Sequence, residues 1–184
     1  MRILGGELRG RAFEQPKTSA VRPLSDKVRA AIFDVAGVPM GGVVLDVYAG
    51  SGAAGFEALS RGAAMVEAIE TNPRVVRLIE ANAAALGLHW GYLLHALKLE
   101  TWLALPGNQP SADRPQSRYN LIIADPPYAR LDAELLERLV PFLRPEGALV
   151  VSHSSKYRAP ELAGASLAKH KVYGDTALSF YTLA

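Results

Sequence analysis

Short apolar runs alternate with amphipathic stretches through the middle of the chain. The runs, which are typical of buried strands, lie near residues 43–47, 65–69, 91–95, 119–124 and 147–152. Apolar positions recur at helical spacing over residues 54–61, 73–86, 97–105 and 132–143, and an earlier helix begins at Ser25 or Asp26 and ends at Gly37. This alternation predicts parallel strands joined by crossover helices.

The two ends of the chain have a different pattern. Residues 168–173 and 177–183 flank Gly174-Asp175, which predicts an antiparallel hairpin. Residues 2–13 alternate loosely around glycines, which favours a short, exposed β-hairpin followed by a linker. We therefore predict an α/β fold, a doubly wound and mostly parallel sheet with a C-terminal antiparallel hairpin. Residues 1–24 would be a hairpin arm and linker, and residues 25–184 the main domain.

A polar tetrapeptide follows the predicted strand 119–124, at the end where open α/β sheets bind ligands. It reads Asp125-Pro126-Pro127-Tyr128. The carboxylate accepts hydrogen bonds, and we expect it to be ionised near neutral pH, as an exposed Asp is. The prolines hold the Pro126 carbonyl on a rigid turn, and Tyr128 offers a flat face to a planar ring. Together they suit the exocyclic amino group of a nucleobase, and we predict that all four are catalytic. A purely structural turn is the alternative.

A glycine turn follows the strand 43–47. Gly50-x-Gly52-x-x-Gly55, with Glu70 further on, matches the dinucleotide-binding fingerprint. However, Asp46 precedes this turn, and a carboxylate there would repel a pyrophosphate and attract a cation. S-adenosylmethionine carries an ammonium and a sulfonium and has no phosphate, so Asp46 favours that cofactor over NAD. A structural turn beside a solvated Asp is the third interpretation.

The cofactor would lie along the ends of three predicted strands. Glu70 would accept both ribose hydroxyls. His95 either contacts the adenine or is an ordinary residue at a strand end. In the second case, backbone near Ala96 would make the contact with the adenine. The predicted cofactor-binding residues are Asp46, Ala49, Gly50, Ser51, Gly52, Glu70, Thr71, His95 and Ala96.

Composition excludes several kinds of chemistry. The chain has 184 residues, 49% of them hydrophobic, which suits one globular domain with a sizeable core. It has no cysteine, so disulfides, thiolate–zinc sites and covalent Cys catalysis are excluded. The four histidines show no metal-ligand spacing, so we expect no metal. No apolar run could span a bilayer and no signal peptide begins the chain, so we expect a cytoplasmic protein without a membrane partner.

Charge is concentrated near the N-terminus. Residues 1–30 carry seven basic and three acidic side chains, a formal charge of +4, which leaves −2 for the remainder of a chain whose total is +2. Such an arm is typical of a surface that contacts phosphates, although a solvated basic face is the alternative. The predicted RNA-binding residues are Arg9, Arg11, Arg22, Lys27 and Arg29.

These motifs occur in an order that resembles the RsmD family of S-adenosylmethionine-dependent methyltransferases. The resemblance covers nearly the whole chain. It rests on Ile3-Leu4-Gly5-Gly6 with Arg9-Gly10-Arg11, the segment Arg22 to Arg29, the glycine turn, Asp125 to Tyr128, and Tyr173 to Leu178. His95 departs from the pattern, since such enzymes usually have an Asp there to hold the adenine amino group. Ser152 and Asp34 depart as well.

The resemblance implies methyl transfer to the N2 amino group of a guanine in small-subunit (16S) rRNA, naked or in an assembling subunit, by a protein that is expected to be a monomer. Asp125 and the Pro126 carbonyl would hold the amino group in line with the methyl group. An adenine-N6 methyltransferase acting on DNA or RNA, a protein-glutamine methyltransferase, and an RNA-binding module with a relic cofactor pocket remain open.

Overall fold

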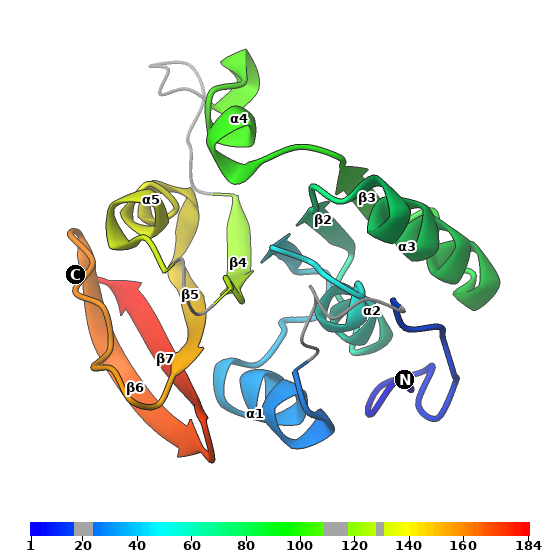
Figure 1. Ribbon diagram of the computed structural model, residues 1–184, viewed down its shortest axis with the longest axis horizontal. Coiled ribbons are helices and arrows are strands. Elements are labelled where there is room, and N and C mark those ends of the chain that lie inside the picture. The colour runs from blue at the N-terminus through cyan, green and yellow to red at the C-terminus, as the bar shows by residue number, and fades with distance from the viewer. Residues whose placement is uncertain (17–23, 109–117, 128–130) are drawn as a thin grey trace.

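The computed structural model describes residues 1–16, 24–108, 118–127 and 131–184. These residues form a seven-stranded sheet in the order β3-β2-β1-β4-β5-β7-β6 (Figure 1). The strands are β1 (Val43–Val47), β2 (Met65–Ile69), β3 (Tyr92–His95), β4 (Tyr119–Ala124), β5 (Leu143–Ser154), β6 (Ala165–Tyr173) and β7 (Thr176–Leu183). β1 to β5 run parallel, and β7 pairs antiparallel with both β5 and β6. The predicted mostly parallel sheet with a C-terminal hairpin is confirmed.

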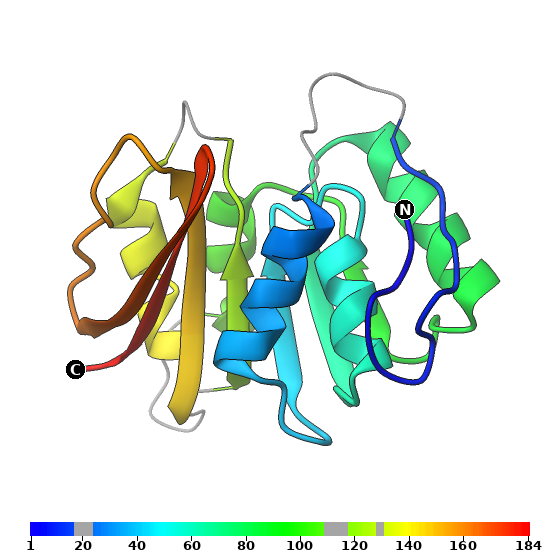
Figure 2. The same ribbon diagram turned by 90° about the horizontal axis from the view of Figure 1, so that it is seen from below.

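Helices cover both faces of the sheet, so that each face has its own apolar core (Figures 1 and 2). Helices α1 (Asp26–Ala36), α2 (Ala53–Ser60) and α3 (Pro73–Leu86) pack on one face. Helices α4 (Leu99–Leu103) and α5 (Ala133–Glu137) pack on the other. The chain order reverses between β1 and β4, and this reversal leaves a crevice at the carboxyl ends of the strands.

Local signals set the helix boundaries. Ser25 caps α1 by accepting the Val28 N–H, and Asn72 caps α3 with Pro73 in its first turn. The predicted single helix over residues 132–143 is wrong. Helix α5 ends at Glu137, and a short 3₁₀ helix, Val140–Phe142, leads into β5. Pro141 explains the break, because its ring removes a backbone donor and clashes with the preceding turn.

Residues 1–13 fold back on themselves, with an antiparallel bridge between Arg2 and Ala12 and a hydrogen bond from the Ile3 N–H to the Arg11 carbonyl. The expected hairpin pairing is thus present in short form, but the expectation that the arm projects freely is wrong, because it is docked on the helices. Ile3 and Phe13 are 1% and 7% exposed and belong to the core beneath α2 and α3. Figure 2 shows the arm running beside these helices.

Helix α2 anchors the arm through two polar side chains. Glu57, which is fully buried, accepts the Leu4 N–H at 2.8 Å, and Ser60 Oγ accepts the Leu8 N–H at 2.9 Å. Arg61 also donates to Glu57, through Nε, at 2.8 Å. The arm thus adds hydrogen bonds to the buried side chains of Glu57 and Ser60.

The edges of the sheet differ from its middle. β3 has four residues, and β6 is exposed along almost its whole length. Among the described residues, no helix is long and apolar enough to cross a bilayer, and no cluster of His, Asp and Glu side chains could hold a metal ion.

Candidate functional site

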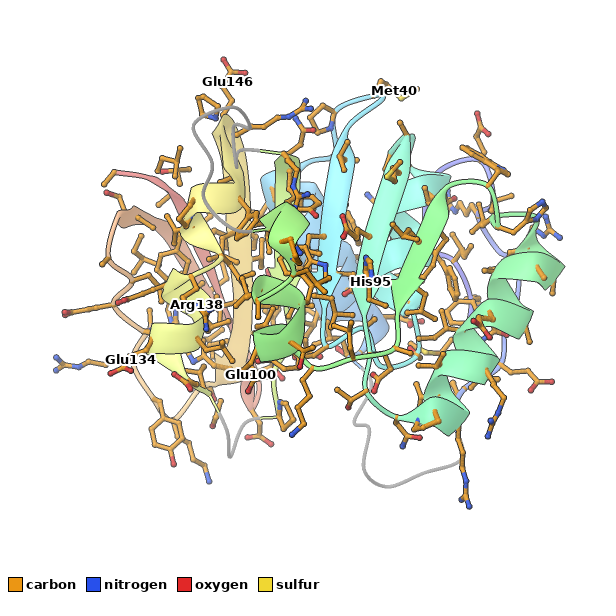
Figure 3. All side chains as sticks on the ribbon, turned by 90° about the horizontal axis from the view of Figure 1, so that it is seen from above. Met40, His95, Glu100, Glu134, Arg138 and Glu146 are labelled. Carbon is orange, nitrogen blue, oxygen red and sulfur yellow. The ribbon has the colours of Figure 1, made fainter. Side chains whose placement is uncertain are left out.

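A cavity of about 1090 Å³ opens at the carboxyl ends of β1, β2 and β4. Glu100, which lines the cavity, marks the carboxyl end of the parallel strands in Figure 3, and Met40 and Glu146 mark the opposite end. Predicted residues that line the cavity are Asp46, Ala49, Gly50, Ser51, Glu70, Thr71, Asp125, Pro126 and Pro127. The fold therefore brings the glycine turn and the Asp-Pro-Pro segment into one site, as their positions after parallel strands predict.

Asp46 is the most deeply buried carboxylate of the wall. Its side chain is on β1, is 3% exposed, and accepts the Gly55 N–H at 3.0 Å. Burial raises the pKa of Asp46 to about 7, and the charges of Asp125 and Glu70 act in the same direction. The hydrogen bond from Gly55 opposes this rise. Because Asp46, Asp125 and Glu70 lie together in the wall of the cavity, a bound cation would be strongly favoured.

Asp125 begins the segment after β4, and its N–H donates to the Val47 carbonyl at 3.4 Å. Burial raises the pKa of Asp125 to about 6, which a hydrogen bond with Ser152 partly opposes. Asp125 is half-buried rather than exposed, and its pKa is higher than that of an exposed Asp, but a pKa of about 6 still leaves the carboxylate largely ionised near neutral pH. Ser152 lies on β5, beside β4, and its pairing with Asp125 depends on strand register that no local pattern reveals.

Glu70 braces the glycine turn. Its Oε2 accepts the Gly50 N–H at 2.9 Å, and its Oε1 accepts the N–H groups of Thr71 and Asn72 at 2.7 and 2.8 Å. A carboxylate oxygen has two lone-pair directions, so capacity remains for other donors. The side chain thus fixes the turn to the start of α3 as well as facing the cavity.

The glycine turn depends on left-handed backbone. Gly50 and Gly52 have φ angles of 55° and 76°, which side chains rarely tolerate. A Cβ on Gly52 would also come within 2.9 Å of the Phe56 ring. Gly52 is the N-cap of α2, and it is not in the cavity wall, unlike Gly50.

Tyr48 is a site residue that sequence reasoning missed. It lines the cavity directly after β1 with a φ angle of 63°, a conformation that a bulky residue adopts only under constraint. Burial raises the pKa of Tyr48 to about 12. Nothing in the local sequence signals this backbone conformation.

His95 has a different environment from the one expected for an adenine contact. Its Nε2 lies 2.8 Å from Glu67 Oε1, and the same carboxylate accepts from Trp102 Nε1 and the Tyr119 hydroxyl. His95 is the last residue of β3 and its carbonyl accepts the Glu70 N–H at 3.1 Å, but its side chain is directed to Glu67 on β2. Neither His95 nor Ala96 is in the cavity wall, so the structure does not bring the imidazole to the site.

The predicted basic residues divide into three groups. Arg29 is 1% exposed, and its guanidinium donates to the Arg2 carbonyl and to Asp26, so the predicted phosphate contact is wrong for Arg29. Arg9, Arg11 and Lys27 are all exposed, and Arg11 also donates to the last carbonyls of α3. Arg22 and Tyr128 lie outside the described residues.

Comparisons with known proteins agree with this site. The family model described as conserved hypothetical protein 95 matches residues 1–182. Ribosomal RNA small subunit methyltransferase D of Escherichia coli K12 is 32% identical over 189 residues, covering 98% of this chain and 89% of the relative. The solved structure of the E. coli methyltransferase yhhF is 31% identical, with a TM-score of 0.83, and the match covers 100% of this chain and 97% of that one.

A more distant structure shares the fold alone. It is an RNA methyltransferase of Salinibacter ruber in complex with S-adenosyl-L-homocysteine, 15% identical, with a TM-score of 0.67 over 88% of this chain and 94% of that one. The fold and the matched relatives define a Rossmann-like methyltransferase. Within that class, the chain belongs to the conserved hypothetical protein 95 family, which is the RsmD family.

Proposed function

We propose that this protein transfers a methyl group from S-adenosylmethionine to the exocyclic N2 amino group of a guanine in small-subunit rRNA. One observation carries the proposal: a half-buried carboxylate, Asp125, and the Pro126 turn face the same cavity as the glycine turn. The E. coli relative named for small-subunit ribosomal RNA supports the substrate class.

The chemistry of the cavity wall suits this cofactor. The carboxylates Asp46, Glu70 and Asp125 favour a sulfonium and an ammonium and disfavour the pyrophosphate of NAD. A volume of about 1090 Å³ is ample for a nucleoside-sized ligand. Ala53 and Ala54, in the first turn of α2, also line the cavity, and N–H groups in a first turn lack partners within the helix. These groups suit the carboxylate of the amino-acid portion.

The cofactor, when bound, supplies an already activated methyl group. The residues of this chain then need to align the target nitrogen rather than generate a strong base. In our proposal Asp125 and the Pro126 carbonyl accept the two N–H groups of the target amine and direct its lone pair at the methyl carbon. Ser152 orients Asp125 and helps to keep it ionised. Glu70 would bind the ribose hydroxyls, and Asp46 would face the cationic end.

Methyl transfer to rRNA extracted from a strain that lacks the enzyme would test the proposal. With labelled S-adenosylmethionine, we expect the label in small-subunit rRNA, and nucleoside mass spectrometry should identify it as N2-methylguanosine. The label in N6-methyladenosine, in DNA or on a protein glutamine would contradict the guanine assignment while leaving the methyltransferase class intact.

A further inference from the structure

The turn after β5 carries an exposed aromatic ring between two cations. Tyr157 is 69% exposed, and Lys156 and Arg158, on either side, are also exposed. We call these three residues the 156–158 turn. A single exposed tyrosine is common on protein surfaces, so its position and charge environment decide whether it has a function.

The turn is fixed to the wall of the cavity. Ser154 pairs with Thr176 at the end of β5, and the Ser155 N–H donates to the Asp175 carbonyl at 2.9 Å. Thr176 and Asp175 both line the cavity. Tyr157 follows Ser154 by three residues, which limits its Cα to within about 11 Å of that strand end. The turn therefore lies at the edge of the sheet on which the cavity opens.

The 156–158 turn is also held rigidly. The Tyr157 N–H donates to the Ser154 carbonyl at 3.1 Å, and the Lys156 N–H lies 3.3 Å from Ser154 Oγ. A ring on an ordered turn loses little conformational entropy when it binds a ligand. This rigidity suits a stacking platform.

Charge around the cavity directs where a phosphate backbone can run. The cavity wall itself is acidic, so phosphates would be repelled from its interior. One exposed cation, Lys98, lines the wall itself. Other exposed cations lie outside it: Lys27 in the first turn of α1, with its Nζ 5.8 Å from the Tyr173 ring centroid, and the two cations of the 156–158 turn. Arg29 is buried, so a phosphate-binding path along this rim would use Lys27, which the N-terminal charge pattern indicated, together with Lys156 and Arg158, which it did not.

We propose that the 156–158 turn is a docking surface for single-stranded RNA next to the target base. Tyr157 stacks on a neighbouring nucleobase, and Lys156 and Arg158 contact the adjacent phosphates. This inference rests on the proposed function only in requiring an RNA substrate. Aromatic stacking accepts any base, so the turn contributes affinity and register rather than base choice.

Equilibrium binding of a fluorescent small-subunit rRNA fragment, measured with S-adenosylhomocysteine present, tests the turn. We expect Tyr157→Ala to weaken RNA binding about tenfold, within the range for the loss of one base–aromatic stack, and Tyr157→Phe to bind like wild type. Lys156→Ala with Arg158→Ala should lower the salt slope of binding by roughly 1.4 units, the value for two contacts to a single strand. Affinity for S-adenosylhomocysteine should not change in any of these variants.

The chain offers matched controls at the other end of the sheet. Trp90 is also 69% exposed but precedes β3, and Arg144 is exposed near the start of β5. Trp90→Ala and Arg144→Ala should leave RNA affinity and its salt slope unchanged. Equal RNA affinities for Tyr157→Ala and Trp90→Ala would overturn the inference, as would a wild-type protein that does not bind the fragment. Methylation of a base other than guanine, with the Tyr157 effect intact, would revise the proposed function and leave the docking surface standing.

Discussion

Asp46 and Asp125 share one cavity, and both have raised pKa values that couple ligand binding to pH. Burial raises their pKa values to about 7 and about 6. A bound cation stabilises the ionised forms, so binding must release the protons that the free protein holds. Affinity for a cationic ligand should therefore rise as the pH increases through this range.

We predict that the affinity for S-adenosylmethionine increases between about pH 6 and about pH 8 more steeply than the affinity for S-adenosylhomocysteine, which lacks the sulfonium charge. Calorimetric titration of both ligands across this range measures the difference. Asp46→Asn should reduce the difference in slope. Parallel pH profiles for the two ligands in the wild-type protein would exclude a role for these carboxylates in recognising the sulfonium.

Asp125 has its proposed role in turnover rather than in holding the cofactor. We predict that Asp125→Asn lowers kcat by roughly 100- to 1000-fold, the range for loss of one aligning hydrogen bond. Affinity for S-adenosylhomocysteine should change little. Asp132→Asn is a suitable control, because Asp132 lines the same cavity and an Asn preserves its capping of Leu135. Single-turnover rates separate the two variants, and comparable rates would rule out the proposed alignment by Asp125.

At the scale of elements, the close approach of α2 to the sheet depends on Gly55. A Cβ there would come within 2.6 Å of the Tyr92 ring and 3.0 Å of Val66. The Gly55 N–H also holds Asp46, so a shift of α2 would disturb the cavity. Helical propensity favours alanine by about 1 kcal/mol, but the contact leaves no room for it.

We therefore predict that Gly55→Ala is destabilising by about 1–3 kcal/mol, the usual cost of overpacking, and that it weakens cofactor binding. Gly107→Ala is the control, since a Cβ at Gly107 would meet nothing within 4 Å. Urea denaturation and calorimetry measure the two effects. If the Gly55 variant is as stable as wild type, the packing of α2 tolerates more movement than these distances allow.

The sequence correctly predicted the helices and strands whose bounds depend on neighbouring residues alone. The bounds of β1, β2, β4 and α3 agree with the sequence expectation because apolar periodicity and caps decide them. The predicted helix over residues 132–143 was longer than α5, because the sequence pattern did not take into account the break that Pro141 causes.

In the candidate site too, some features follow from local sequence and others depend on contacts between distant segments. The glycine turn and Asp125 meet because parallel strands end together. The Asp125–Ser152 bond, the left-handed Tyr48 and the Glu67 partner of His95 depend on contacts between distant segments, which residue spacing does not encode.

At the scale of the whole molecule, the docked arm makes residues 1–14 part of the core. Its removal would expose to solvent the apolar surface that Ile3 and Phe13 cover. Glu57 would lose the hydrogen bond from the Leu4 N–H, and Arg29 would lose its bond to the Arg2 carbonyl. Positive charge in this segment is thus only partly available to RNA.

We predict that deletion of residues 1–14 lowers the free energy of unfolding by about 3 kcal/mol or more, since two large apolar side chains leave the core. Cofactor affinity should fall with it. Arg9→Ala, which removes an exposed charge from the same arm, should leave both unchanged. Thermal denaturation and ligand titration give the answer, and a truncated protein as stable as the full chain would show that the arm packs only loosely.

The outer strands bear on self-association. Open strand edges invite pairing with other chains, and proteins commonly prevent this with short or charged edge strands. β3 is short, and β6 carries Lys169 and Lys171 along its exposed length. We predict that replacing both lysines with valine produces concentration-dependent oligomers in analytical ultracentrifugation, whereas Lys27→Val does not. A monodisperse double variant would show that the charges are dispensable.

The position of β7 has a consequence for how the chain assembles. β7 lies between β5 and β6, although it follows both in sequence, so the sheet cannot be completed until the last strand has formed. β5 and β6 never pair with each other, so each has an open edge until residues 176–183 insert between them. Insertion of β7 therefore closes the sheet, and a folding intermediate in which β7 is not yet in place would present two open strands to other chains.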